Sequence, residues 1–490
     1  MNSTSLLDCV QAALKHQVQI DFSQLDVEKA KGAHQEAAGQ FDTTIQTRAS
    51  HGQTETPLTS TEQQARLQDD LRQLDSQYTI GLSKEFRPGF SLSPQLETTR
   101  SETHDSRATP SSSSGIYLSA TLPLLRGQGT EANAALETAA ELDIQNSRAD
   151  LQQAMNQAVR EVTAAYWQYV SNHQQLVQHR KAEQRARKLY NQTRLLVDGD
   201  ERPRADLDEV RANLAEKKTT RMASEQDLIH SREELGLAMG VSFSRIRSLP
   251  PPEDTFQILK PSLDELSGIN EKALISHAIQ NRPDLRASRG REDSAAAREK
   301  YYENQLLPQV DVGMKVGYEG LKEGDGYQTM ALAPYSNVPG ASWQVSLTYE
   351  FPVANRQARG RLTQQRVAKR RQMLSSRELE RKIQSKVYTT LCILRSARHE
   401  LKNSRQAEEL YLQAVENQLM KYKMGMGTQI DVITTQDNLT QARLNKVNAQ
   451  YKYARALTDL RYQTSTLLTF AQDQATVGLE HLTRLPRSKH

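Results

Sequence analysis

The sequence predicts a mainly helical chain with a smaller β portion, built from two similar halves. Residues 206–214 and 431–439 carry Asp, Asn and Leu at the same relative places, 225 residues apart. Residues 118–124 and 347–353 are both strand-like stretches that contain a proline and precede a long helical run. Residues 130–197 contain neither proline nor glycine, so they can form one very long helix. A period this long excludes a solenoid of short repeats and indicates one large unit that has been duplicated.

Each half is expected to contain a short helix, a second helix, strands, a very long helix, a turn and a final long helix. The predicted helices of the first half include 5–20, 22–40 and 130–197, and its predicted strands are 41–47, 77–83, 90–96 and 116–122. The second half adds strands at 308–318 and 343–351 and a long helix at 355–423. The pattern therefore predicts two long antiparallel helical hairpins, one in each half.

A run of three prolines at residues 250–252 marks a linker between the halves. The predicted domain boundaries are 1–250 for the first structural repeat, 251–262 for the linker, 263–470 for the second structural repeat and 471–490 for a polar C-terminal tail.

Composition narrows the class of protein. Only 37% of the residues are hydrophobic and the mean hydropathy is −0.70, which is low for a compact globule and favours long helices and thin layers. The net charge of +4 is too weak and too dispersed to predict a nucleic-acid partner. The two cysteines, Cys9 and Cys392, lie far apart and without metal-ligand spacing, so we expect no metal site and no cofactor.

Catalysis finds little support in the sequence. It contains no glycine-rich phosphate loop, no paired histidines with metal-ligand spacing and no nucleophile elbow. We therefore predict that the protein is not an enzyme.

No run approaches the ~18–20 apolar residues of a membrane helix. No secretory signal peptide is visible at the start, so we expect a mature or truncated reading frame.

The predicted strands alternate apolar and polar residues. A soluble sheet that caps a coiled coil alternates in this way, and so does a transmembrane β-barrel, and the alternation alone does not decide between them. One chain offers only about four to six strands, too few to close a barrel. Since an open sheet edge is not tolerated in lipid, a membrane location requires several copies to pool their strands.

Taken in order, several short motifs resemble those of the TolC family of outer-membrane efflux proteins, over about residues 5–470. They are Pro123-Leu124-Leu125-Arg126-Gly127, Asn281-Arg282-Pro283-Asp284-Leu285, Leu306-Leu307-Pro308, and the stretch from Gly425 through Asp431-Val432, followed by Gln436, Asn438 and Leu439. Each motif alone is weak, and the resemblance rests on their order, their spacing and the duplication.

The resemblance implies a homotrimer. Each chain would contribute about four strands to one twelve-stranded β-barrel in the outer membrane, and its helices to an α-barrel through the periplasm. The implied function is an exit duct for efflux or type I secretion. The implied partners are outer-membrane lipid, a periplasmic adaptor protein and an inner-membrane transporter that drives export.

The same resemblance implies roles for two helix turns, which would form the periplasmic tips and contact the adaptor. The tip residues are Asp198, Gly199, Asp206, Gly425 and Gly427. Asp431 corresponds to an acidic ring in the tip aperture, and Thr434 takes the place of a second acid. A basic latch residue of the family corresponds to Gly427 and is therefore missing. The alternative interpretation of Asp431 is a helix N-cap, which stabilises by about 1 kcal/mol, and the two roles can coexist.

The chief alternative function is a soluble structural protein, a long coiled-coil spacer without transport activity. This interpretation explains the helices but poorly explains the duplicated strands that end in proline.

Residues 51–115 are long for the family, and the Arg87-Pro88-Gly89 turn signal indicates that they could add a β-hairpin.

Overall fold

The computed structural model describes residues 4–66, 70–103, 109–201, 203–259, 269–336, 338–471 and 474–486. The chain divides into two compact units, and both halves of the sequence contribute to each. The helical unit comprises Met1–Glu28, Gln145–Arg289 and Leu374–His490. The sheet unit comprises Lys29–Ile144 and Gly290–Met373.

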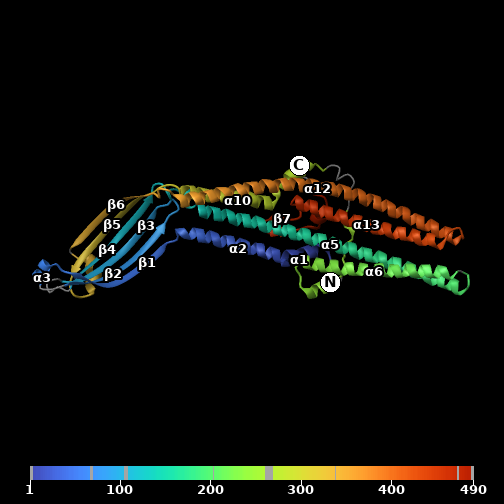
Figure 1. Cartoon of the computed structure of the whole chain (residues 1–490), viewed down its shortest axis with the longest axis horizontal. Coiled ribbons are helices and arrows are strands. Elements are labelled where there is room, and N and C mark those ends of the chain that lie inside the picture. Colours follow the sequence, from blue (N-terminus) through green and yellow to red (C-terminus); the bar gives the residue numbers. More distant parts are fainter. Residues whose placement is uncertain are drawn as a thin grey trace. The chain divides into compact units, whose positions relative to one another are not determined.

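Helices account for most of the described residues (Figure 1). The α-helices are α1 (Leu6–His16), α2 (Val18–Ala38), α3 (Ser60–Arg66), α4 (Thr130–Asn133), α5 (Ala135–Asp198), α6 (Arg204–Ala238), α7 (Phe243–Arg247), α9 (Glu271–Asn281), α10 (Pro283–Asn304), α11 (Gln328–Leu332), α12 (Arg356–Lys423), α13 (Gln429–Gln463) and α14 (Leu479–Thr483). The 3₁₀ helices of the described residues are η1 (Gly39–Phe41), η2 (Phe256–Ile258) and η3 (Ala333–Tyr335). None of the described helices is long and apolar enough to cross a membrane.

The strands are β1 (Thr44–Pro57), β2 (Asp70–Glu85), β3 (Ser91–Thr103), β4 (Ser111–Pro123), β5 (Gln309–Glu323), β6 (Pro339–Glu350), β7 (Thr469–Ala471) and β8 (Gln474–Thr476). The first six form one sheet in sequence order, with every neighbouring pair antiparallel. The sheet is open, because β1 and β6 pair on one side only.

The duplication is visible in the lengths of the elements. The helices α1 and α9 have 11 residues each, and α2 and α10 have 21 and 22. The helices α6 and α13 have 35 residues each, and α13 begins and ends 225 residues after α6. The predicted repeat boundaries stay a prediction, and residues 260–262 of the predicted linker lie outside the described part of the chain.

The prediction of about four strands per chain is wrong for this sheet, which has six. The two additional strands are β2 and β3, which form a hairpin around Arg87-Pro88-Gly89 and lie between β1 and β4. The hairpin forms because both strands alternate apolar and polar residues on either side of a proline-glycine turn, and Gly89 adopts φ 105°, which favours glycine.

The core of the helical unit is centred on α5. Trp167 and Tyr166 are fully buried, and the Trp167 ring stacks on Phe256 with centroids 5.4 Å apart. The Tyr166 hydroxyl donates to the carboxylate of Asp254 at 2.9 Å, and the same carboxylate accepts from the backbone N–H of Leu6 at 2.8 Å. The partly buried carboxylate of Asp254 therefore joins the start of α1 and the segment before η2 to α5.

The predicted polar C-terminal tail at 471–490 stays a prediction, and part of this segment packs on the helical core. Leu482 of α14 is buried in the helical core. The Arg461 side chain of α13 is also buried, and it donates to the carbonyl oxygens of Glu480, Arg484 and Leu485. Burial lowers the pKa of Arg461 to about 10. The end of the chain packs there because a buried guanidinium needs several acceptors at once.

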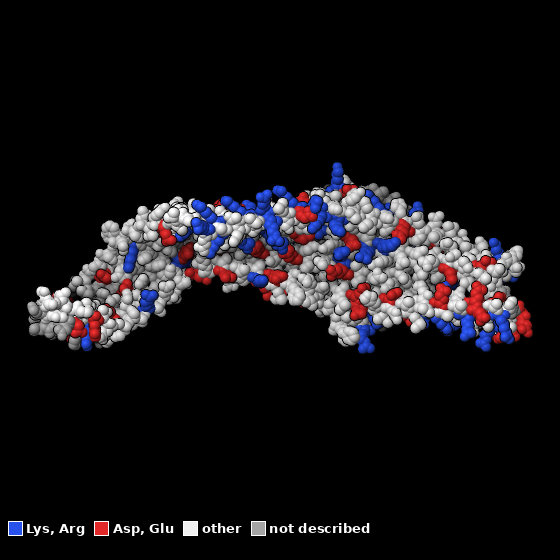
Figure 2. Space-filling model, in the orientation of Figure 1, with Lys and Arg blue, Asp and Glu red and all other residues white. Residues whose placement is uncertain are grey.

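Charges of both signs lie along the helices, whereas the visible face of the sheet is largely uncharged (Figure 2). The two faces of the sheet also differ. One face carries rows of apolar residues, and one such row is Ile80, Leu96, Ile116, Tyr318 and Ala341, which Thr47 of β1 continues with a polar side chain. The other face carries polar residues, including Gln77 and Glu97, which form a hydrogen bond of 2.6 Å.

Candidate functional site

The predicted site residues lie in and next to two helix turns of the helical unit. The first turn, residues 199–203, joins α5 to α6, and the second turn, residues 424–428, joins α12 to α13. Figure 1 shows both turns at the same end of this unit. Side chains join the two hairpins there, because the Gln429 amide donates to the Thr193 hydroxyl at 2.7 Å in a buried contact.

The second turn closes α12 with a glycine in the left-handed region. Gly425 has φ 73°, and its N–H donates to the carbonyl of Tyr422 at 3.1 Å. The N–H of Met426 donates to the carbonyl of Lys421 at 2.9 Å. This pair of hydrogen bonds is a Schellman motif, which satisfies the last carbonyl groups of a helix.

The first turn repeats this geometry with different residues. Asp200 has φ 58°, and its N–H donates to the carbonyl of Val197 at 3.1 Å. The N–H of Glu201 donates to the carbonyl of Leu196 at 2.9 Å. The left-handed residue is therefore Asp200 and not its neighbour Gly199, and aspartate is one of the few residues that tolerate this conformation.

The start of α13 carries a capping box. The Thr428 side chain accepts from the Asp431 N–H at 3.2 Å, and the Asp431 carboxylate accepts from the Thr428 N–H at 3.0 Å and from its hydroxyl at 2.7 Å. The N-cap is thus Thr428, and the expectation that Asp431 is itself the N-cap is wrong. The hydrogen bonds from Thr428 hold the pKa of Asp431 below its usual value. The Thr-x-x-Asp spacing was the sequence signal for this box.

Asp431 and Thr434 lie one helical turn apart, and both are exposed. The exposed stripe continues along α13 through Asn438, Gln441 and Asn445, which are polar and uncharged. Asp431 is therefore the acidic end of a neutral polar stripe. The structure places these two predicted residues on one face of one helix.

The other predicted residues are distributed over both turns. Asp198 is the last residue of α5 and lies 3.5 Å from Arg194, with both side chains exposed. Asp206 lies in the first turn of α6, and its N–H donates to the carbonyl of Pro203 at 3.2 Å. Gly427 packs beside the Gln418 amide, which a Cβ atom at Gly427 would approach to 3.0 Å.

Further side chains next to the turns join the hairpin of α5 and α6 to the hairpin of α12 and α13. The sequence pattern did not identify these residues. The Lys217 ammonium of α6 lies 2.9 Å from the Asp437 carboxylate of α13. The Arg185 guanidinium of α5 donates to the Thr440 hydroxyl at 2.7 Å. Burial, and then the charge of Arg443, lowers the pKa of Arg185. The two copies differ here, because Asp437 has Ala212 as its counterpart in α6.

The arrangement offers exposed carboxylates and hydroxyls at a helix end. Across the described segments, no group of three or more His, Cys, Asp or Glu side chains is placed to hold a metal ion. An exposed carboxylate that hydrogen bonds keep ionised can attract cations. The candidate site can therefore act on ions through electrostatic attraction.

Residues 274–464 match the outer membrane efflux protein family. The predicted resemblance to this family is thereby confirmed. The fold is also that of solved outer-membrane channels. CmeC of Campylobacter jejuni is 14% identical with a TM-score of 0.69, and the match covers 94% of this chain and 85% of CmeC. No curated protein sequence matches the chain.

Two further solved structures agree. The outer-membrane channel OprN is 14% identical with a TM-score of 0.68, and the match covers 94% of this chain and 89% of OprN. The outer membrane protein VceC of Vibrio cholerae is 15% identical with a TM-score of 0.65, and the match covers 94% of this chain and 95% of VceC. All three of these solved structures are outer-membrane proteins.

Proposed function

We propose that this chain is one subunit of a trimeric outer-membrane channel, with a helical tunnel that extends into the periplasm. The channel is the exit duct of an efflux or type I secretion system. An inner-membrane transporter supplies the energy, and a periplasmic adaptor joins that transporter to the duct. The match to the outer membrane efflux protein family supports this assignment.

The single observation that carries the proposal is the two-faced sheet. Its apolar face exposes large side chains in the single chain, including Trp343 at 78%, Leu347 at 70% and Ile116 at 65%. A monomeric soluble protein rarely exposes a continuous apolar surface of this kind. A β-barrel wall requires one, because lipid lies against one face and water against the other.

The unpaired edges support assembly. Every residue of β1 and of β6 is exposed in the single chain. An unpaired edge is not tolerated in lipid, so membrane insertion requires other copies to pair with both edges. A soluble coiled-coil spacer, the alternative function, would leave both this face and these edges in water.

In this proposal the two turns form the periplasmic tips and contact the adaptor. Three copies of Asp431 narrow the aperture and favour cations, and Thr434 lines it one turn further along. Asp198, Gly199, Asp206, Gly425 and Gly427 shape the tips. The support is the exposure of Asp431 and its depressed pKa, which keeps the carboxylate ionised.

The test is conductance of the purified protein in planar bilayers. We expect a trimer in detergent that conducts ions, with a reversal potential in a KCl gradient that indicates cation preference. In Asp431→Ala this potential moves toward zero, because the aperture loses its charge. In the control Glu409→Ala, which removes an exposed carboxylate from α12, it stays unchanged. A monomer that never conducts would contradict the proposal.

A further inference from the structure

The hairpin β2–β3 is built like the strands on either side of it. On β2 the apolar face carries Tyr78, Ile80 and Leu82, and on β3 it carries Leu92, Pro94 and Leu96. The register aligns these residues with the apolar residues of β4, β5 and β6. Leu82 of β2 pairs with Ile45 of β1, and Pro94 of β3 begins the row that continues through Leu118, Val316 and Trp343. The hairpin therefore continues the apolar band of its neighbours at the same height.

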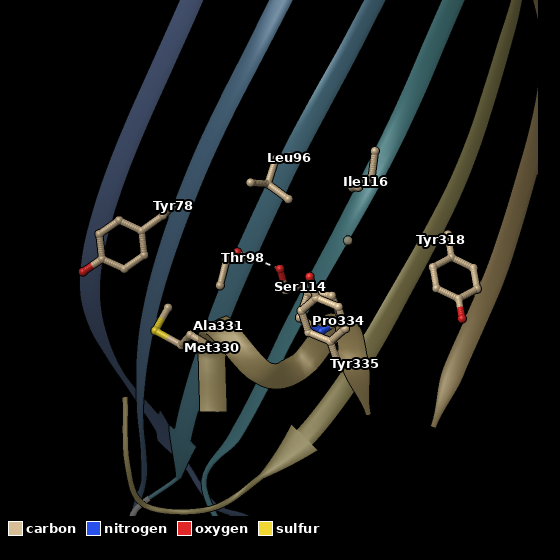
Figure 3. A pocket seen from close by; sticks show the side chains of 11 residues that line it. Tyr78, Leu96, Thr98, Ser114, Ile116, Tyr318, Met330, Ala331, Pro334 and Tyr335 are labelled. Atoms are coloured by element: carbon tan, nitrogen blue, oxygen red, sulfur yellow. Dashed lines mark hydrogen bonds between the residues drawn. The ribbon is translucent and has the colours of Figure 1, made fainter. Parts of the chain in front are cut away.

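A pair of aromatic rings marks one end of this apolar band, and a short helical segment marks the other. At the turn of the hairpin, the Phe86 and Phe90 rings stack with centroids 4.5 Å apart, as in the aromatic girdle of a membrane barrel. At the other end, the segment of α11 and η3 lies over the apolar face beside Tyr78 and Thr98 (Figure 3). A cavity of about 680 Å³ remains between this segment and the strands.

The turn of the hairpin is held by the sheet unit itself. The Arg87 guanidinium forms two hydrogen bonds with the Glu137 carboxylate, of 2.7 and 2.6 Å, and lies 5.0 Å from the centroid of the Phe41 ring. The carbonyl of Pro88 accepts from the N–H of Gly129 at 3.0 Å. A Cβ atom at Gly89 would lie 2.0 Å from the carbonyl oxygen of Gly127. These contacts fix the hairpin turn in place within the sheet unit.

The number and direction of the strands permit closure. The sheet has six strands in alternating directions, so β1 and β6 run in opposite directions. A copy related by rotation about a barrel axis presents a β1 with the same direction as the first β1. This β1 can pair with the neighbouring β6 in the antiparallel sense, as a transmembrane barrel of this kind requires.

We propose that three copies of this chain close an eighteen-stranded barrel, in which β2 and β3 span the membrane. The proposal rests on the trimeric channel proposed above and specifies the strands that form its barrel. Barrel diameter grows roughly in proportion to strand number. With strands about 4.8 Å apart and tilted by about 40°, eighteen strands give about 36 Å between opposite backbones, against about 24 Å for twelve. Barrels of this size hold a water-filled lumen.

The test is the accessibility of single spin labels in vesicles of phosphatidylcholine. Each variant carries one new cysteine in a Cys392→Ser background, in which the remaining Cys9 is buried. The labels stand at Ile80 and Leu96 on the apolar face of the hairpin, and at Thr79 and Gln95 on its polar face. The matched controls are Val316 and Lys315, on the apolar and polar faces of β5.

We expect labels at Ile80→Cys and Leu96→Cys to collide more with oxygen, which partitions into lipid, and those at Thr79→Cys and Gln95→Cys more with a water-soluble nickel chelate. If the β5 controls alternate and the hairpin labels do not, the eighteen-stranded barrel is wrong while the channel stands. If the controls also fail to alternate, the channel itself is wrong. Native mass spectrometry in detergent must give three chains, since two would make twelve strands.

Discussion

The two helix turns have the same backbone geometry and different chemistry. Both end a long helix with a Schellman motif, at positions 225 residues apart. The second turn uses Gly425 and the Thr428 cap, whereas the first uses Asp200 and places Pro203 at a position with no side-chain cap. The difference teaches that the helices around a turn, and not its glycine, determine where the chain reverses.

The largest effect is expected from the leucines at matched places in the two hairpins. Leu235 of α6 and Leu460 of α13 are both fully buried in the core of the helical unit. Leu235→Ala and Leu460→Ala should each lower the free energy of unfolding by about 2–5 kcal/mol, because each leaves a cavity. Thermal melting followed by circular dichroism measures both losses.

Gln226→Ala, an exposed change on α6, is the control and should alter the melting temperature little. A large loss in one hairpin beside a tolerated change in the other would contradict the idea that both hairpins pack equivalently.

A smaller effect, which differs between the two turns, is expected at the left-handed positions. Gly425→Ala should destabilise the second turn by about 1–2 kcal/mol, because an L-residue with a Cβ atom is strained there. Asp200→Gly should not destabilise the first turn, since it removes that strain. Limited proteolysis at the two turns measures the difference, and faster cleavage of Asp200→Gly would refute the assignment.

The smallest effect concerns the cap that only the second turn has. Thr428→Ala should weaken the start of α13 by about 1 kcal/mol. Amide hydrogen exchange over residues 428–435 should speed up, while exchange over residues 203–210 stays unchanged. Equal changes in both segments would contradict a local role for the cap.

The same cap should weaken in acid. The pKa of Asp431 is lower in the folded chain than its ordinary value. Its contribution is therefore complete above the ordinary value and is lost as the pH falls through the lowered pKa. Exchange over residues 428–435 should report this loss in the wild type and much less of it in Thr428→Ala.

The sequence predicted the helices well, because their signals are long and local. The predicted helices 130–197 and 355–423 correspond closely to α5 with α4 and to α12. The repeat around Asp206 and Asp431 placed both turns correctly. Such patterns extend over many turns of helix, so single exceptions do not obscure them.

The strands were harder to predict, because pairing depends on distant residues. The Arg87-Pro88-Gly89 turn and the alternation of residues 77–83 and 90–96 indicated the hairpin, but Pro94, which lacks an N–H group, is unusual in a central strand. Only the register with β2 and β4 places Pro94 inside the sheet. The packing of the chain's end around Arg461 also depends on contacts that no local pattern reveals.

The unpaired outer strands make an isolated copy hazardous. The outer edges of β1 and β6 carry backbone N–H and C=O groups without partners in the sheet, beside an apolar face. Edges of this kind can pair with strands of other chains and so promote aggregation. In the proposed trimeric channel these edges are covered only when neighbouring copies pair with them. Under that proposal, folding and oligomerisation are closely coupled.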